Sequence, residues 1–505
     1  MADRSPTVAI VGGGLAGLSA ACALAGSGFR VTVFERRPYL GGRASSYEHP
    51  GTGEVVDNCQ HVLFGSCTNL LAFYKTIGIE NKIRWFDRMT FIEPGGRQSQ
   101  LEPTFLPAPL HLTPSFMGFK FLNARDKLSL ARGLMALMFS VPKDKDEKDE
   151  DDGTSFQDWL TRHHQTPNAI ERFWKPILVS ALSEDMDRIA VPYAAQVVRE
   201  SMKSPEARRM GIPQVPLTEL YNAARDYISA HDGQIRFRAS VQSFTPTPQG
   251  VRIKLQDSEE DFDYGVLAVP FDSLSMLLPD SADPASAPPS SSKAPDTLRE
   301  KLAHFETAPI TGVHLWFDRR ITDLPHAVLL DRTIQWMFHK SQLLTREGTA
   351  SAVPDASPQS LSSRAEQSRD LLSRAAPSYV ELVISASKSL RDKPRQEIID
   401  LALAELKEFF PAARAATLIK STVIKEVNAT FSPTPGIDRY RPASATEWPR
   451  IFLAGDWTAT GWPATMEGAV RSGSIAAEQI TTAAGAGKRF LVPDLAPTGL
   501  MRLLG

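Results

Sequence analysis

The residues with the clearest chemical meaning lie near the amino terminus. They form a G-x-G-x-x-G motif directly after an apolar run, and comprise Gly12, Gly14, Leu15, Ala16 and Gly17. The first glycine permits a tight turn, the second lets the backbone approach a pyrophosphate, and the third allows close packing of a helix on a strand. Glu35 ends the next apolar run, about 20 residues on, where a carboxylate can bind ribose hydroxyls. The motif therefore predicts a dinucleotide site, and the acid disfavours a ligand with a 2′-phosphate.

A glycine- and arginine-rich segment follows at once. It reads ERRPYLGGR over residues 35–43; its glycines let the backbone crowd a ligand, and its last arginine supplies positive charge. The segment resembles that of the flavin amine oxidase and phytoene desaturase superfamily, whose members place ER…GGR along the FAD pyrophosphate and flavin. The resemblance implies FAD as the cofactor. The contacts that it implies here are Arg36 (favoured over Arg37), Gly41, Gly42 and Arg43.

The matching half of this site lies far along the chain. Residues 451–456 read IFLAGD, and residues 461–473 read GWPATMEGAVRSG. In the same superfamily a Gly-Asp pair lies at the ribityl-phosphate end of FAD, and the aspartate accepts a hydrogen bond from a hydroxyl group of the cofactor. The next helix start faces flavin N1 and O2, where reduced flavin is anionic, and a further backbone position holds the adenine. The resemblance thus adds Val241, Gly455, Asp456, Thr465 and Met466 to the expected FAD contacts.

Three further segments narrow the resemblance. VDNCQHVLFG (56–65), residues 313–340 and AGDWTATGWPATMEGAV closely resemble the squalene-associated FAD-dependent desaturase-like proteins, the hydroxysqualene dehydroxylases. That family implies hydride transfer from reduced flavin N5 to an allylic carbon of hydroxysqualene, giving squalene for hopanoid synthesis. A phytoene-type carotenoid desaturase or another flavin amine oxidase-like enzyme is the alternative, because the same N5 geometry serves both directions. A non-catalytic prenyl-lipid-binding chaperone is a third hypothesis, which the complete flavin motifs disfavour. The electron donor stays unidentified.

Removal of a hydroxyl group needs a general acid, and His61 is the candidate. It lies in the segment expected to approach the flavin, and imidazole titrates near neutral pH. An equal alternative is that His61 only packs against the isoalloxazine ring or bonds to backbone. Glu184 and Asp185 are alternative acids whose position is more typical of helix ends or of the surface. Cys59, His61 and Cys67 lack the spacing and the fourth ligand of a zinc site, so the sequence predicts no metal.

Composition limits the class of protein. The 505 residues include 56 Lys and Arg against 58 Asp and Glu, and this net charge of -2 excludes a strongly basic nucleic-acid surface. Three cysteines cannot form a disulfide framework over such a length, which indicates a reducing compartment. The uncharged stretch 6–29 is rich in glycine and divides into a strand and a helix, so it predicts neither a membrane span nor a signal peptide. The expected location is the cytoplasm.

Apolar periodicity predicts an α/β fold with a discontinuous Rossmann-type FAD-binding domain, an inserted α+β substrate domain and a helical subdomain. The expected strands after the first are 30–34, 234–244, 251–255, 264–270, 312–317, 378–385 and 450–455. The expected helices are 68–78, 122–139, 168–182, 217–231, 396–410 and 467–482. The FAD-binding domain is expected at 1–100, 216–280 and 425–482. The other regions are a helical insertion at 101–215, a substrate domain at 281–424 and a tail at 483–505. Low-complexity segments occur at 143–153, 283–296 and 347–365.

A small-molecule isoprenoid lipid needs a long apolar pocket, and part of the insertion is rich in apolar residues. Residues 104–122 and 128–141 contain many Leu, Met and Phe. One hypothesis is a tunnel wall or a membrane-facing entrance, which would make the protein peripheral on the inner face of the membrane; the alternative is ordinary helix core. The mixed basic and apolar tail, 488–505, fits a membrane contact and a docked tail equally well.

Overall fold

The nucleotide-binding half is built around a parallel sheet whose strands come from distant parts of the chain. The computed structural model describes residues 5–139, 153–278, 297–344 and 378–503. The sheet has the order β10-β2-β1-β14-β20, and all neighbouring strands run parallel. Its strands are β1 (Thr7–Val11), β2 (Arg30–Glu35), β10 (Gln234–Phe237), β14 (Tyr264–Leu267) and β20 (Ile451–Leu453). This arrangement confirms the predicted α/β class and its Rossmann-type sheet.

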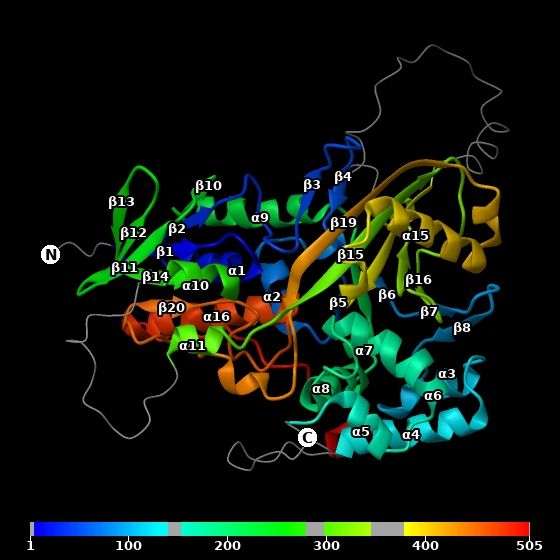
Figure 1. Ribbon diagram of the computed structural model, residues 1–505. Helices are drawn as coiled ribbons and strands as arrows, with labels where there is room; N and C mark the ends of the chain where they lie inside the picture. Colours follow the sequence, from blue (N-terminus) through cyan, green and yellow to red (C-terminus); the bar gives the residue numbers. More distant parts are fainter. Residues whose placement is uncertain (1–4, 140–152, 279–296, 345–377, 504–505) are drawn as a thin grey trace, which may run out of the picture.

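Four helices lie beside this sheet, and the first and last of them are rich in small residues (Figure 1). They are α1 (Leu15–Ala25), α2 (Thr68–Thr76), α9 (Leu217–Ala230) and α16 (Met466–Ala483). A Cβ atom on Gly473 of α16 would lie 2.2 Å from the carbonyl oxygen of Ala16 in α1, so this crossing requires glycine. The close contact brings the last long helix beside the first nucleotide-binding turn. It explains how motifs from the two ends of the chain form one site.

A seven-stranded sheet forms the second half, in the order β19-β15-β18-β17-β16-β7-β8. Its strands are β7 (Met89–Ile92), β8 (Gln98–Leu101), β15 (Thr307–Phe317), β16 (His326–Leu329), β17 (Trp336–Phe338), β18 (Ser378–Ser385) and β19 (Leu418–Phe431). The helix α15 (Arg395–Phe409) shares a buried core with this sheet. Strand pairing places residues 89–101 in this seven-stranded sheet, whereas the sequence analysis assigned residues up to 100 to the FAD-binding domain. The sequence missed β19, because exposed and half-buried residues interrupt its apolar pattern.

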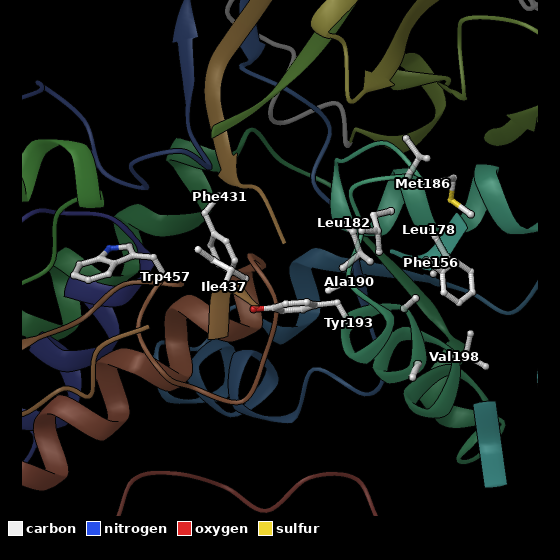
Figure 2. Packing of buried hydrophobic residues seen from close by; sticks show 14 of the residues in the cluster. Phe156, Leu178, Leu182, Met186, Ala190, Tyr193, Val198, Phe431, Ile437 and Trp457 are labelled. Atoms are coloured by element: carbon white, nitrogen blue, oxygen red, sulfur yellow. The ribbon is translucent and has the colours of Figure 1, made fainter. Parts of the chain in front are cut away.

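A helical layer lies beside this sheet in the inserted region (Figure 1). Its helices are α3 (Thr113–Gly118), α4 (Ala124–Phe139), α5 (Phe156–Arg162), α6 (Pro167–Ala169), α7 (Lys175–Leu182) and α8 (Val191–Met202), with a π-helical turn between α6 and α7. Figure 2 shows its core continuing through Tyr193 toward Phe431, at the end of β19, and Trp457, just after β20. The Tyr193 ring meets that of Phe431 edge-on at 6.3 Å, and its hydroxyl donates to Asp438 at 2.8 Å. These contacts hold the helical layer against the end of β19 and the segment that follows it.

The predicted strand 234–244 is two strands that belong to different sheets. β10 ends at Phe237, and β11 (Ser243–Thr247) begins an antiparallel sheet with β12 (Gly250–Lys254) and β13 (Glu259–Phe262). Arg238, with a φ of +55°, turns the chain between them. The linking residues 239–241 therefore leave the sheet and reach the cavity described below.

Smaller elements complete the described part of the chain. The short strands are β3 (Ser46–Glu48), β4 (Val55–Asp57), β5 (Leu63–Phe64), β6 (Ile83–Phe86) and β9 (Met210–Pro213). The short helices include α10 (Phe271–Leu277), α11 (Leu298–Leu302) and α12 (Lys340–Leu343). The predicted low-complexity segments lie outside the described residues, apart from Gly153. No helix within the described ranges is long and apolar enough to cross a membrane.

Candidate active site

One large cavity lies between the two halves of the molecule. It encloses about 660 Å³, with walls from both sheets and from the helical layer. The expected site residues that line it are Gly12, Gly14, Leu15, Ala16, Glu35, Arg36, Gly41, Gly42, Arg43, His61, Val241, Gly455, Asp456, Thr465 and Met466. Gly17 lies behind the wall: a Cβ there would be 2.0 Å from the carbonyl oxygen of Gly12, so this glycine serves the packing of α1. Motifs that are far apart in the sequence thus meet at one cavity.

The glycines build a narrow cradle that side chains would fill. Gly41 has a φ of +103°, and a Cβ on it would lie 2.1 Å from the carbonyl oxygen of Ala44. A Cβ on Gly42 would lie 2.9 Å from the Cα of Gly14, and the Gly41 N–H donates to the carbonyl of Gly13 at 3.0 Å. Gly14 begins α1 without a side-chain cap, so the first N–H groups of the helix remain available to an anion. The cradle fits a pyrophosphate.

Glu35 is held by the same turn. Its two carboxylate oxygens accept hydrogen bonds of 2.7 Å from the backbone N–H groups of Gly13 and Arg37, and the side chain is buried. Each oxygen keeps a lone pair for a ribose hydroxyl. Both Arg36 and Arg37 line the cavity, and the guanidinium of Arg37 also donates to the carbonyl of Gly42 at 3.0 Å. The two backbone N–H groups therefore fix the orientation of the Glu35 carboxylate.

Asp456 also lines the cavity and forms an ion pair with Arg43, which follows the Gly41-Gly42 pair. A buried arginine that the sequence did not reveal, Arg441, holds the backbone beyond Asp456. Its guanidinium donates to the carbonyl oxygens of Asp456 (3.0 Å), Thr458 (2.6 Å) and Trp462 (2.7 Å), and its side chain is 2% exposed. Arg441 thus fixes the loop that leads to α16, which the Thr465 hydroxyl caps by accepting from the Gly468 N–H. Arg441 belongs to no recognisable sequence motif, so this role could not be predicted from the sequence.

His61 lines the cavity, and its ring is fixed by backbone. Nδ1 lies 2.8 Å from the carbonyl oxygen of Cys59. A carbonyl only accepts, so Nδ1 carries the hydrogen and Nε2 of the neutral ring is an acceptor. Burial lowers the pKa of His61, although the Cys59 carbonyl works against this shift. The ring is therefore neutral near pH 7 and must gain a proton at Nε2 before it can act as an acid.

A buried network behind this segment escaped the sequence analysis. The ammonium of Lys340 donates to Asp57 at 2.7 Å and to the amide oxygen of Gln60 at 2.8 Å, and it lies 3.4 Å from Glu381. The Gln60 amide in turn donates to the carbonyl of His61 at 2.9 Å. Burial and the charge of Asp57 raise the pKa of Glu381 to about 7, against the opposing charge of Lys340. The network thus anchors the segment that carries His61.

Glu184, one of the alternative acids, lies at a helix end, as the sequence suggested, directly after the C-cap Ser183 of α7. It is not at the surface, because its side chain is fully buried. It pairs with Lys388 and accepts a hydrogen bond from Ser432. These bonds lower its pKa although burial acts in the opposite direction. Since Glu184 does not line the cavity, its contacts join α7 to the second sheet.

The rest of the cavity wall is largely apolar. Its side chains come from the helical layer and from the second sheet, and include Met89, Leu112, Phe116, Leu134, Phe173, Trp174, Ile177, Val328, Phe338 and Val383. The FAD cradle and this apolar chamber are continuous within one cavity. A long apolar molecule in the chamber would therefore reach the region that the flavin motifs surround.

Comparison with known proteins agrees with this geometry. The family model "Flavin containing amine oxidoreductase" matches residues 15–481. The chain belongs to this family. It is an FAD-dependent oxidoreductase, and the glycine cradle, the Glu35 carboxylate and the uncapped start of α1 fit that cofactor. Because the family consists of oxidoreductases, the chaperone hypothesis loses its support.

Relatives with isoprenoid substrates match almost the whole chain. The 15-cis-phytoene desaturase of Synechococcus elongatus is 27% identical over 492 residues, which cover 94% of this chain and 95% of the relative. The hydroxysqualene dehydroxylase of Rhodopseudomonas palustris is 27% identical over 508 residues, which cover 95% of this chain and 99% of the relative. Among solved structures, an oxidoreductase from Methanosarcina mazei has a TM-score of 0.66 and 17% identity, covering 92% of this chain and 98% of its own. Identity therefore does not separate the two isoprenoid activities.

Proposed function

We propose that the enzyme reductively removes the hydroxyl group of hydroxysqualene and releases squalene. The observation that carries this proposal is the single cavity in which the FAD cradle opens into an apolar chamber. Support also comes from the hydroxysqualene dehydroxylase of Rhodopseudomonas palustris, which matches over nearly its full length. The segment 56–65, which resembles that family, lies at the same cavity and carries His61.

When bound and reduced, FAD supplies a hydride to the allylic carbon whose C–O bond breaks, and the oxygen leaves as water after it gains one proton. The apolar walls exclude bulk water and hold the chain of the substrate along the cavity. We assign the proton to His61, which receives it at Nε2 while Nδ1 stays bonded to the Cys59 carbonyl. The Lys340–Gln60 network keeps this segment in place.

The FAD contacts are proposed residue by residue. Gly12, Gly14 and the start of α1 face the pyrophosphate, and Glu35 binds the adenosine ribose. Arg43 and Asp456, which form an ion pair with each other, would hold the ribityl-phosphate region. Thr465 and Met466 begin α16 beside the flavin ring, and the residues around Val241 cover the adenine. Each assignment combines the resemblance to the superfamily with the position of the residue in the cavity wall.

A carotenoid desaturase is the second candidate. The phytoene desaturase of Synechococcus elongatus is as similar as the dehydroxylase, and the same cavity would place its hydrocarbon substrate. The two reactions run in opposite directions: the dehydroxylase oxidises the flavin, and the desaturase reduces it. Oxidised enzyme should therefore convert phytoene to a more conjugated product only under the second hypothesis.

The deciding experiment uses FAD-loaded enzyme without oxygen. After chemical reduction of the flavin, one equivalent of hydroxysqualene should reoxidise it and yield one equivalent of squalene, followed by absorbance and by mass spectrometry. Squalene labelled from flavin N5 deuterium would establish the hydride route. Unchanged hydroxysqualene with flavin that stays reduced would contradict the proposal.

We also propose a peripheral membrane contact on the helical layer. Large apolar side chains are exposed there, most of them on or beside α3 and α4: Phe105, Leu110, Met117, Leu128 and Met135. The same helices contribute Phe116 and Leu134 to the cavity wall, so they could pass a lipid inward. Substituting Phe105, Met117 and Leu128 by Ser should reduce co-sedimentation with phospholipid vesicles. Equal binding by the triple variant would contradict this placement.

A further inference from the structure

One hydroxyl group in the apolar chamber has a hydrogen to donate. Ser180, on α7, lines the cavity, and its oxygen accepts a hydrogen bond of 2.8 Å from the indole N–H of Trp336. Among the described residues the Ser180 hydroxyl makes no hydrogen bond as a donor. A serine in a helix commonly donates to the carbonyl four residues earlier. Here the indole bond occupies the oxygen and leaves the hydrogen for another acceptor.

The surroundings make this donor effective. Trp336 is 9% exposed and stacks on Phe338, with ring centroids 5.5 Å apart, so its N–H has a fixed direction. A hydrogen bond received by a hydroxyl strengthens the one that it donates, and an apolar environment strengthens both. Ile177, one turn earlier on α7, and Val383, paired with Trp336, also line the cavity and offer no side-chain acceptor. An oxygen atom on the ligand would satisfy the hydroxyl.

Strand pairing links this donor to the segment that carries His61 through two neighbouring strands. Trp336 lies opposite Val383, and Val383 lies opposite Gly312 on the next strand. Gly312 in turn packs on the backbone of Asn58 and Cys59: a Cβ on it would lie 3.4 Å from the Asn58 carbonyl oxygen. Both the donor and the expected flavin-facing segment line the cavity, and two strands of the second sheet connect them.

We propose that Ser180, oriented by Trp336, binds the oxygen of a hydroxylated isoprenoid and so distinguishes it from a hydrocarbon of the same length. This inference rests on the proposed function, whose substrate it places with its C–O bond toward the His61 side of the cavity. The serine forms no covalent bond and transfers no proton. It holds the oxygen that departs as water, while the apolar walls bind the rest of the chain. Ser180 is thus a specificity-determining residue.

The test measures binding to the oxidised, FAD-loaded enzyme, in which no hydride is available. Hydroxysqualene and squalene are titrated separately in detergent micelles, and binding is followed by the perturbation of flavin absorbance. The wild-type enzyme should bind the alcohol about tenfold more tightly, a difference of about 1.4 kcal/mol, which one hydrogen bond in an apolar site can supply. Ser180→Ala should abolish this preference and leave squalene binding unchanged. Ser180→Thr, which retains a hydroxyl, should restore it.

Ser201 provides the matched control. It also lines the cavity from a helix, but its hydroxyl already donates to the Val197 carbonyl at 2.6 Å. Ser201→Ala should therefore keep the full preference for the alcohol. A wild-type enzyme without the preference, or a Ser180→Ala variant that retains it, would overturn the inference. Because the titration needs no turnover, a Ser180-dependent preference would support the inference even if the anaerobic dehydroxylation failed.

Discussion

The two halves of the cavity are built on different principles. The cofactor half is made by backbone: Gly12, Gly41 and Gly42 have positive φ angles, and Glu35 is held by two backbone N–H groups. The substrate half is made by side chains from helices and strands that are far apart in the sequence, such as Ser180 and Trp336. Backbone shape depends on a few local residues, whereas a wall of side chains depends on the whole fold. Substitutions should therefore affect the two halves in different ways.

The largest effect is expected in the cofactor half, from Gly41→Ala. The new Cβ would lie 2.1 Å from the Ala44 carbonyl, in a backbone conformation that alanine rarely adopts. We expect flavin-free protein on purification, measured by the ratio of absorbance at the flavin and protein maxima. Gly53→Ala is the control, because Gly53 has a φ of +69° but open space around it. A yellow Gly41→Ala variant would contradict the role of this turn.

The next largest effect is expected in the Lys340 network, which anchors the segment that carries His61. Lys340→Met would leave Asp57 buried and without its cation, which should lower the free energy of unfolding by about 3–5 kcal/mol. Adding Asp57→Asn should recover part of this loss, because the amide keeps bonds from Ser46 and Leu217 without a charge. Denaturant unfolding of the single and double variants measures both steps. Additive losses would argue against direct coupling of the pair.

A smaller effect, now on catalysis, is expected from His61→Gln. The glutamine cannot carry the proton, so turnover of hydroxysqualene should fall about 100-fold with FAD content unchanged. Since burial lowers the pKa of His61, the protonated form grows as pH falls, and the rate should rise from pH 8 toward pH 5. The variant should lose this slope. Unchanged turnover would leave His61 with only the structural role of its bond to Cys59.

The pH dependence of the free energy of unfolding tests Glu381, the member of this network on β18. Its pKa lies at about 7 in the folded protein, above the usual value of 4.5, so the folded state binds more protons than the unfolded state between these values. The contribution of Glu381 to stability is therefore present at low pH and is lost as pH rises through 7. Glu381→Gln should flatten this dependence and gain about 2 kcal/mol relative to wild type between pH 5 and pH 8. Parallel curves would contradict a neutral Glu381.

The same contrast explains how much the sequence could predict. The Rossmann-type strands, the glycine turn and Glu35 follow from local motifs, because a turn of fixed φ and a helix start are short-range properties, and the resemblance to the superfamily supplied most of the other expected residues that line the cavity. The sequence missed Arg441, Lys340 and Ser180, because each acts through partners that only the tertiary structure brings near. The strand β19 and the division of 234–244 were missed for the same reason: pairing partners, rather than the apolar pattern, define them.

The smallest effect is expected at the border between the two halves, from Asp456→Ala. Asp456 pairs with Arg43, whose side chain is 32% exposed, so the solvated arginine tolerates loss of its partner with little change in stability. The flavin should lose one hydrogen-bond acceptor, and its dissociation constant should rise about tenfold. Asp187→Ala, at an exposed position, is the control. Full FAD retention in the Asp456 variant would show that the glycine cradle alone holds the cofactor, which would make the cofactor half a purely backbone-built site.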